Sequence, residues 1–381
     1  MSGPLLVPSR PAVSARSVVV LAVALVVGFV LVRLVLATSI GGFAVAGDRF
    51  VDPALTPDRL PVTAESGGYD GQFVYRLALE PWTDQATAFG ITLDNPAYRQ
   101  QRIATPALAW AVSLLPGVST LLALLLVNVA ALTVAAAFAV RLAVALGRHP
   151  LTGLVLAVPA GMPISLGRHL TEPVAWAAVL AGLWYARQRR WAPAAAALTV
   201  AGLARETSLV VVAGLAAAEL WRLLSGPGRD RRAVAWQLVL LQVWGVLPVR
   251  SGGPTNFGGL PVLGVLDTLA AGVPGPAVLT LVVTAERVGV LALFGYAALA
   301  LATHRAAVTG GEAAGWALSV LLALALAGWT SDVQFLRAAN EGIGLSVLVA
   351  LSDRRSRAGR WALLLAAAMA CGVALEYAVR Q

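Results

Sequence analysis

The chain has 381 residues, of which 59% are hydrophobic and only 12% are charged. A soluble domain needs more polar surface than this, so the composition excludes a soluble fold and predicts that lipid surrounds most of the chain. All 28 basic residues are arginines, set against 19 acidic residues, and they gather in short segments between apolar runs. The net charge of +9 therefore reports membrane topology and does not indicate a nucleic-acid partner.

The first apolar run extends from Ser17 to about Ile40 and follows Arg10 and Arg16. It is longer than the roughly 7 to 15 apolar residues of a signal-peptide core, so we interpret it as an uncleaved first span with a cytoplasmic N-terminus. The alternative is cleavage after Ala46, because residues 44–46 imitate a signal-peptidase site. Arg33 inside the run disfavours that alternative.

Residues 41–102 form the one sizeable polar segment, with eight acidic residues against five arginines and hence a net charge of −3. An acidic segment directly after an arginine-flanked first span is expected outside the cytoplasm. The following run, 103–116, is shorter than the roughly 17 to 25 residues that a span needs, which predicts an interfacial or re-entrant segment.

Ten further apolar runs complete a single all-α membrane domain, 1–381, of about eleven transmembrane helices with a long first extracytoplasmic loop. They are expected at 118–141, 151–166, 173–187, 192–204, 207–222, 233–249, 277–303, 312–329, 335–352 and 361–378. Arginines flank alternate connections, which predicts an inner-membrane protein with its N-terminus in the cytoplasm and its C-terminus outside. Cys371 is the single cysteine, so no internal disulfide and no cysteine-based metal site is expected.

The weakest boundary is at Arg205 and Glu206, because 192–222 could also be one long tilted helix. One helix would leave either the arginines at 187–190 or those at 222–232 outside. A break at Arg205 keeps both groups cytoplasmic, and we therefore expect two helices.

The most informative stretch is Gly67-Gly68-Tyr69-Asp70-Gly71-Gln72-Phe73-Val74-Tyr75-Arg76-Leu77-Ala78, with Tyr98-Arg99-Gln100-Gln101-Arg102 downstream. An acidic residue in the first outer loop, followed by a tyrosine and an alanine, resembles the GT-C glycosyltransferases. The whole segment also resembles bacterial proteins of cell-surface glycopolymer formation. The resemblance implies a catalytic carboxylate at Asp70, with Asp48 as second candidate, and substrate contacts from Tyr69, Gln72 and Tyr75. Many GT-C enzymes have two adjacent acidic residues where this chain has Asp70 and Gly71, so a divalent cation stays open as cofactor.

An extracytoplasmic transferase needs a sugar donor carried on a lipid, whose leaving group is a lipid phosphate. Guanidinium groups neutralise such a phosphate through bidentate hydrogen bonds. Arginines at outer ends of spans are unusual, so a phosphate site is expected among a subset of them. The candidates are Arg99, Arg102, Arg168, Arg205, Arg250 and Arg337.

Other polar residues have local explanations beside functional ones. Thr171 and Glu172 are expected to cap the span that follows them, and the neighbouring His169 is a candidate substrate contact that could also be an ordinary loop residue. Glu206 is either a substrate contact or a solvent-exposed residue at the turn of a helical hairpin. Arg33 and Glu286 are expected to form ion pairs between helices.

These features predict a glycosyltransferase that moves a sugar from a polyprenyl-phosphate carrier to a cell-envelope glycan or lipid on the extracytoplasmic face. Its partners would be membrane lipids, the polyprenyl-phosphate sugar and the glycan acceptor. The alternatives are a glycolipid transporter or flippase, which would not need the acidic loop, and a non-enzymatic scaffold for envelope assembly.

Overall fold

The computed structural model describes residues 13–58, 60–225, 277–325, 329, 334–354 and 356–379. Helices make up most of these residues, and the strands in them are two pairs of two-residue segments. The all-α class expected from the composition is confirmed. The predicted span 233–249 and the candidate Arg250 lie outside the described residues.

Within the part of the chain that the structure describes, four helices are long and apolar enough to cross a membrane by length and composition. They are α1 (Ala15–Ala37), α5 (Thr120–Ala145), α13 (Ala277–Ala302) and α17 (Arg357–Val379). Each coincides with a predicted apolar run. The other helices between them are shorter: α8 (Glu172–Arg187), α9 (Trp191–Ala204), α10 (Leu209–Ser225), α14 (Gly310–Ala325), α15 (Gln334–Ala338) and α16 (Asn340–Ser352).

The prediction of one spanning helix at 151–166 is wrong. This stretch contains a 3-10 turn, Pro150–Thr152, and two five-residue helices, α6 (Gly153–Ala157) and α7 (Met162–Leu166). Pro159 explains the interruption, because proline lacks the N–H that a helix interior needs and disfavours helical backbone at the preceding residue. Val158 accordingly ends α6 in a non-helical conformation.

The break expected at Arg205 is present. α9 ends at Ala204, Arg205 is extended, and a 3-10 turn, Glu206–Ser208, leads into α10. α9 packs chiefly along α8, whereas α10 packs chiefly along α14. The two charged residues therefore lie at a junction of separate helices.

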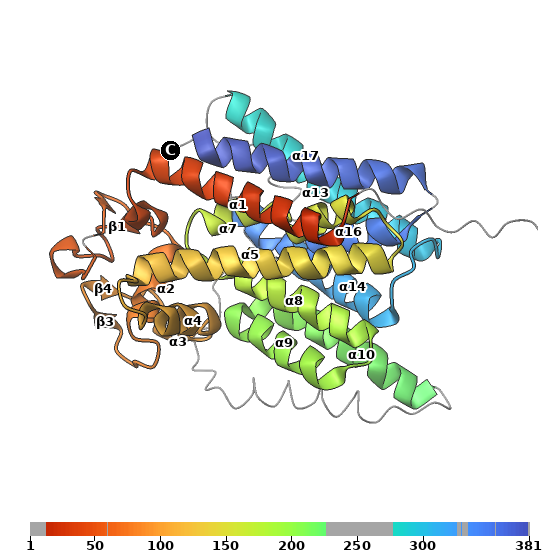
Figure 1. Cartoon of the computed structure of the whole chain (residues 1–381), viewed down its shortest axis with the longest axis horizontal. Helices are drawn as coiled ribbons and strands as arrows, with labels where there is room; N and C mark the ends of the chain where they lie inside the picture. Colours follow the sequence, from red (N-terminus) through yellow and green to blue (C-terminus); the bar gives the residue numbers. More distant parts are fainter. Residues whose placement is uncertain are drawn as a thin grey trace, which may run out of the picture.

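The polar segment 41–102 contains short elements. They are 3-10 turns at Ile40–Phe43 and Pro53–Leu55, the parallel pair β1 (Ala46–Gly47) and β2 (Val62–Thr63), the antiparallel pair β3 (Thr87–Ala88) and β4 (Ile91–Thr92), and the helices α2 (Asp70–Leu79) and α3 (Pro96–Gln100). The ten-residue helix α4 (Ala104–Ser113) occupies the predicted interfacial run. Figure 1 shows these elements gathered at one end of the helix bundle.

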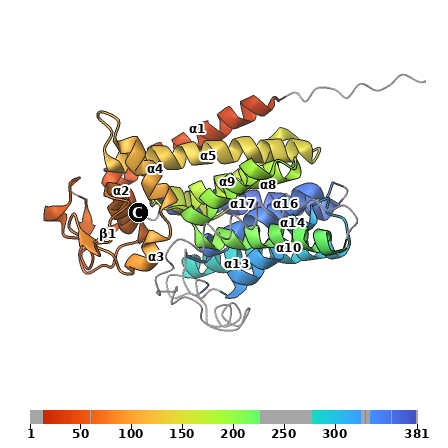
Figure 2. The same cartoon turned by 90° about the horizontal axis from the view of Figure 1, so that it is seen from below.

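The long helices run between this end and the opposite one (Figures 1 and 2). α1 begins at the opposite end and runs toward the polar segment, and the C-terminal end of α17 lies beside that segment (Figure 1). At the opposite end, Arg148 donates to the backbone carbonyls of Leu351 and Asp353, and Arg187 pairs with Glu312. Several arginine-rich connections that the sequence assigns to one side of the membrane thus share one end of the molecule.

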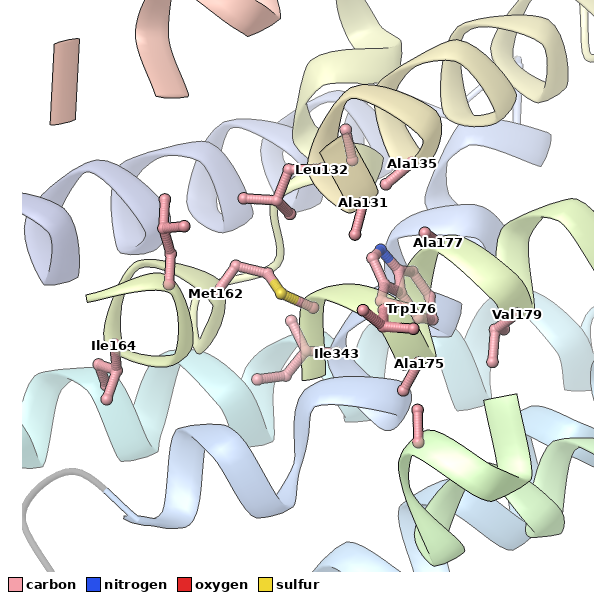
Figure 3. Close-up of a cluster of buried hydrophobic side chains, with 14 of the residues drawn as sticks. Ala131, Leu132, Ala135, Met162, Ile164, Ala175, Trp176, Ala177, Val179 and Ile343 are labelled. Carbon is pink, nitrogen blue, oxygen red and sulfur yellow. The ribbon is translucent and has the colours of Figure 1, made fainter. Parts of the chain in front are cut away.

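The core between the two ends is built from α5, α7, α8 and α16 (Figure 3). Trp176 on α8 is 1% exposed, and its indole N–H donates to the carbonyl of Leu156 at 2.9 Å. A Cβ at Gly344 of α16 would lie 2.2 Å from the Trp176 ring, so only glycine permits this approach. This contact fixes α8 and α16 next to each other about one turn from their first residues, where Glu172 and Glu341 stand.

Candidate functional site

Asp70 is the first residue of α2, where its negative charge is favoured by the helix dipole. Gly71 allows α2 to begin against the loop that precedes α8. A Cβ at Gly71 would lie 2.2 Å from the carbonyl oxygen of Arg168 and 2.9 Å from that of Ala44. The glycine thereby brings the Asp70 carboxylate to the end of the helix bundle.

Arg99 and Arg102 reach the same place from α3. The side chain of Asn95 caps this helix by accepting from the N–H of Tyr98, and Pro96 occupies its first turn. Arg99 lies in the last turn of α3 and Arg102 in the turn that follows. Both side chains line a small pocket together with Asp70, Arg337 and Thr171.

Asp70 is held between two arginines that come from distant parts of the chain. Its Oδ1 lies 2.9 Å from Nη1 of Arg99, and its Oδ2 lies 3.0 Å from Nη2 of Arg337. Burial raises the pKa of the Asp70 carboxyl, but the charges of Arg337, Arg99 and Arg102 lower it by more, so the pKa lies well below its ordinary value. Asp70 is therefore ionised and firmly ion-paired.

Glu172 joins Arg337 to Arg205. Its Oε1 lies 2.8 Å from Nη2 of Arg337 and 2.7 Å from Nη1 of Arg205, and its side chain is 1% exposed. Arg205 also lies 3.8 Å, through Nε, from Oε1 of Glu341, which accepts hydrogen bonds from the hydroxyls of Thr207 and Ser208 at 3.0 Å each. Carboxylates buried this deeply hold their arginines in fixed positions.

A second ion pair connects Arg102, which lines the pocket, to Glu206 at the α9–α10 junction. Glu206 accepts from Arg102 at 2.8 Å through Nε and 2.5 Å through Nη2. The hydroxyl of Tyr98 donates to the same carboxylate at 3.2 Å, and its ring lies 4.4 Å from the Arg102 guanidinium carbon. The charged residues of the α9–α10 junction are thus joined to the Tyr98–Arg102 motif more than a hundred residues earlier.

Arg168 completes the cluster without a carboxylate. Its guanidinium carbon lies 4.1 Å from the centre of the Tyr69 ring, and its Nε donates to the hydroxyl of Tyr377 at 3.0 Å. The Tyr69 ring is also 5.0 Å from the Arg337 guanidinium carbon, and the Tyr69 hydroxyl accepts from Arg337 at 2.6 Å. Among the residues that the structure describes, no acidic side chain lies within ion-pair distance of Arg168.

The cluster is electrically balanced. Five arginines (Arg99, Arg102, Arg168, Arg205 and Arg337) are set against five carboxylates (Asp70, Asp94, Glu172, Glu206 and Glu341). Asp70 and Asp94 are the most accessible of the five, with side chains 27% and 33% exposed. Buried charge networks are weak evidence of stability, because removing the ions from water is costly, and their presence at a membrane protein's polar end points to function.

Of the twelve predicted site residues that lie within the described part of the chain, four make structural contacts. Asp48 accepts from the backbone N–H groups of Glu65 and Ser66 at 2.8 and 3.0 Å. Gln72 links two loops by accepting from the N–H of Gly47 and donating to the carbonyl of Gly67. Tyr75 is fully buried and donates to Asp58 at 2.8 Å. These contacts lie outside the arginine cluster.

His169 is the fourth such residue. It is fully buried and stacks on Phe43 with ring centres 5.2 Å apart, and burial lowers its pKa to about 3. A neutral imidazole in this position does not serve as a cation for phosphate. The expected ion pair of Arg33 is also absent within the described part of the chain, since its guanidinium lies between the rings of Phe43 and Tyr377, at 5.3 and 5.2 Å.

Glu172, Asp94 and Tyr98 are site residues that the sequence did not identify. The expected cap at the start of α8 is only partly present, because Thr171 occupies the N-cap position but makes no side-chain capping bond. Glu172 instead binds two arginines from elsewhere in the chain. For Tyr98 and Asp94 the available signal was their proximity to Arg99 in sequence.

The carboxylates of the cluster do not suit a divalent cation. Each oxygen of Asp70 faces a guanidinium, which would repel a metal ion. Within residues 13–58, 60–225, 277–325, 329, 334–354 and 356–379, no group of three or more histidine, cysteine, aspartate or glutamate side chains could hold a metal ion.

Comparison with known proteins adds no relative. No family model matches the chain, and neither a curated protein nor a solved structure resembles it significantly.

Proposed function

We propose that the chain is a GT-C-like glycosyltransferase of about eleven spans that uses a polyprenyl-phosphate sugar on the extracytoplasmic face. The observation that carries the proposal is the Asp70 carboxylate held between Arg99 and Arg337 at a pocket that Arg102 also lines. A carboxylate next to several arginines provides both a proton acceptor for an acceptor hydroxyl and cations for a phosphate leaving group. Polar side chains at the end of a membrane bundle suit a lipid-linked substrate.

In the proposed reaction, the acceptor hydroxyl oxygen attacks the anomeric carbon of the donor sugar. The bond between that carbon and the phosphate oxygen breaks, the polyprenyl phosphate leaves with the bonding electrons, and the hydroxyl proton passes to Asp70. The arginines stabilise the phosphate as its negative charge grows. The atoms and charges balance without a metal ion or any further reactant.

The ion pairs of Asp70 imply that the donor binds before Asp70 accepts a proton. A carboxylate whose pKa is strongly lowered by Arg337, Arg99 and Arg102 is a poor base. A phosphate that binds Arg99 and Arg337 competes with Asp70 for the same guanidinium groups. We therefore propose that donor binding releases Asp70 and restores its basicity. Glu172 and Glu341 are buried and keep Arg337 and Arg205 in place during this exchange.

The proposal is tested with the purified full chain, radiolabelled polyprenyl-phosphate hexoses and pentoses, and isolated envelope glycan. Transfer predicts label in the glycan, and the label should be lost with an Asp70→Asn variant. If the protein only moves intact donor across the bilayer of proteoliposomes, it is a flippase and the enzymatic proposal fails.

A further inference from the structure

A second pocket lies at the opposite end of the bundle from Asp70. α8 carries Glu172 of the arginine cluster in its first turn and Arg187 of this pocket in its last. The pocket has a volume of about 210 Å³ between the end of α8, the last turns of α10 and the beginning of α14. Leu183 and Leu215 provide apolar walls, while three arginines and two glutamates provide charge. Nothing in the proposed transfer reaction uses it.

The pocket has one uncompensated positive charge. Arg187 is paired with Glu312, at 2.5 Å from Nε and 2.7 Å from Nη2, and Arg222 is paired with Glu219 at 2.7 Å. Arg189 also lines the pocket, yet no carboxylate of the described residues lies within ion-pair distance of it. Its charge is available to an anion.

The carboxylate of Glu312 is occupied by other contacts, so it does not neutralise the charge of Arg189. Besides pairing with Arg187, Glu312 accepts from the N–H of Thr309 at 2.7 Å, and the Thr309 hydroxyl accepts from the N–H of Glu312 at 3.2 Å. This reciprocal pair is a capping box at the start of α14. Gly311 of the same first turn lines the pocket, where the positive end of the helix dipole adds to the attraction for an anion.

The outer surface of α10 next to the pocket has residues suited to the level of lipid headgroups. Leu220, Trp221 and Leu224 are 47%, 70% and 75% exposed and follow directly after the pocket residue Glu219. Exposed leucines face lipid chains in a membrane protein, and tryptophan is typical of the boundary between chains and headgroups. A molecule with an anionic head and apolar chains therefore matches both surfaces.

We propose that this pocket binds the phosphate of an anionic phospholipid, with Arg189 as its principal contact and the acyl chains along Leu220 and Leu224. Basic pockets between helices at one membrane face are suited to such headgroups. The backbone supports a specific role for Arg189, which has a φ of +56° in a region that favours glycine. An arginine there is conformationally costly and stands where a charge is useful.

Native mass spectrometry of the purified chain with phosphatidylglycerol tests the proposal, with phosphatidylcholine as the neutral lipid. Arg189→Gln should weaken phosphatidylglycerol binding about tenfold, the ratio expected for loss of one charged hydrogen bond. Arg190→Gln is the matched control, because Arg190 is adjacent but stacks on Tyr185 at 5.1 Å and does not line the pocket. It should bind the lipid as the wild type does.

Arg189→Gly separates lipid binding from folding. Glycine fits the positive φ, so this variant should melt at or above the wild-type temperature without lipid and still lose the phosphatidylglycerol preference. Equal phosphatidylglycerol binding by wild type and both Arg189 variants would overturn the proposal. An Arg189-dependent stabilisation by inorganic phosphate as strong as that by the lipid would also overturn it, because the ligand would then be a soluble anion.

Discussion

Replacement of Asp70 by asparagine should strengthen the binding of a polyprenyl phosphate while it lowers the rate of transfer. In the wild type, a phosphate has to displace Asp70 from Arg99 and Arg337, whose nitrogens lie 2.9 and 3.0 Å from its oxygens. Asparagine retains the size of the side chain but removes the competing charge. If the net gain equals a single charged hydrogen bond, about 1.5 kcal/mol, affinity should rise roughly tenfold.

The same substitution removes the proton acceptor, so turnover should fall by roughly 10² to 10⁴. Binding is measured with a fluorescent polyprenyl phosphate and the purified protein, and turnover with a labelled donor. Opposite changes in affinity and rate distinguish the proposed exchange from a general loss of structure, which would weaken both.

Asp48→Asn is the matched control, because Asp48 holds a loop through the N–H groups of Glu65 and Ser66 and lies outside the arginine cluster. It should leave lipid-phosphate affinity within about twofold of the wild type, since no charged contact to the cluster is lost. Folded Asp70→Asn protein that binds the lipid phosphate no more tightly than the wild type would rule out competition between Asp70 and the phosphate. Full turnover by Asp70→Asn together with inactive Asp48→Asn would move the catalytic role to Asp48.

Three further predictions use other parts of the structure. Lysine should be substituted singly at Arg99, Arg102, Arg205 and Arg337. Each substitution should lower donor affinity about tenfold or more, because lysine lacks the planar guanidinium group that binds phosphate through two hydrogen bonds. Normal donor binding by all four variants would show that the phosphate site is wrongly assigned. In a Cys371→Ser background, a cysteine at Ser66 should react with an impermeant thiol reagent in intact cells and one at Ser225 should not; labelling of Ser225 would contradict the predicted topology. Because the pKa of Asp70 is lowered below its ordinary 3.8, its ion pairs stabilise the fold above that pH and are lost as the pH falls through the lower folded value. The melting temperature of Asp70→Asn should therefore fall less steeply below about pH 4 than that of the wild type, and parallel curves would contradict this assignment.

The sequence predicted the four long apolar helices, because each is a local run of residues that needs no distant partner. The total of about eleven spans stays a prediction. The break at Arg205 was also predictable, since the arginines at 187–190 and at 222 constrain which ends of α8, α9 and α10 share a side. The run 151–166 was misjudged because its apolar side chains concealed the effect of Pro159, which divides it into α6 and α7.

The sequence predicted the arginines of the candidate site, but it did not predict which carboxylates pair with them. Glu172 has a sufficient local explanation at the start of α8, and its contact with Arg337 spans 165 residues, which no local pattern reveals. Asp48 and Asp70 both lie beside glycines in the same acidic segment, and only the tertiary contacts distinguish them. His169 was a candidate substrate contact because histidine is polar. Its burial against Phe43 could not be predicted, because it depends on how the segment after α1 packs against the loop before α8.

We propose that Asp70 and the arginines around it cleave the bond between a sugar and a lipid phosphate. A single turnover tests this step, in which purified protein is loaded with a labelled polyprenyl-phosphate sugar and then mixed with envelope glycan. The wild type should release free polyprenyl phosphate as label appears in the glycan, whereas Asp70→Asn should retain intact donor. Intact donor on wild-type protein across the whole panel of hexoses and pentoses, despite tight binding, would contradict the claim.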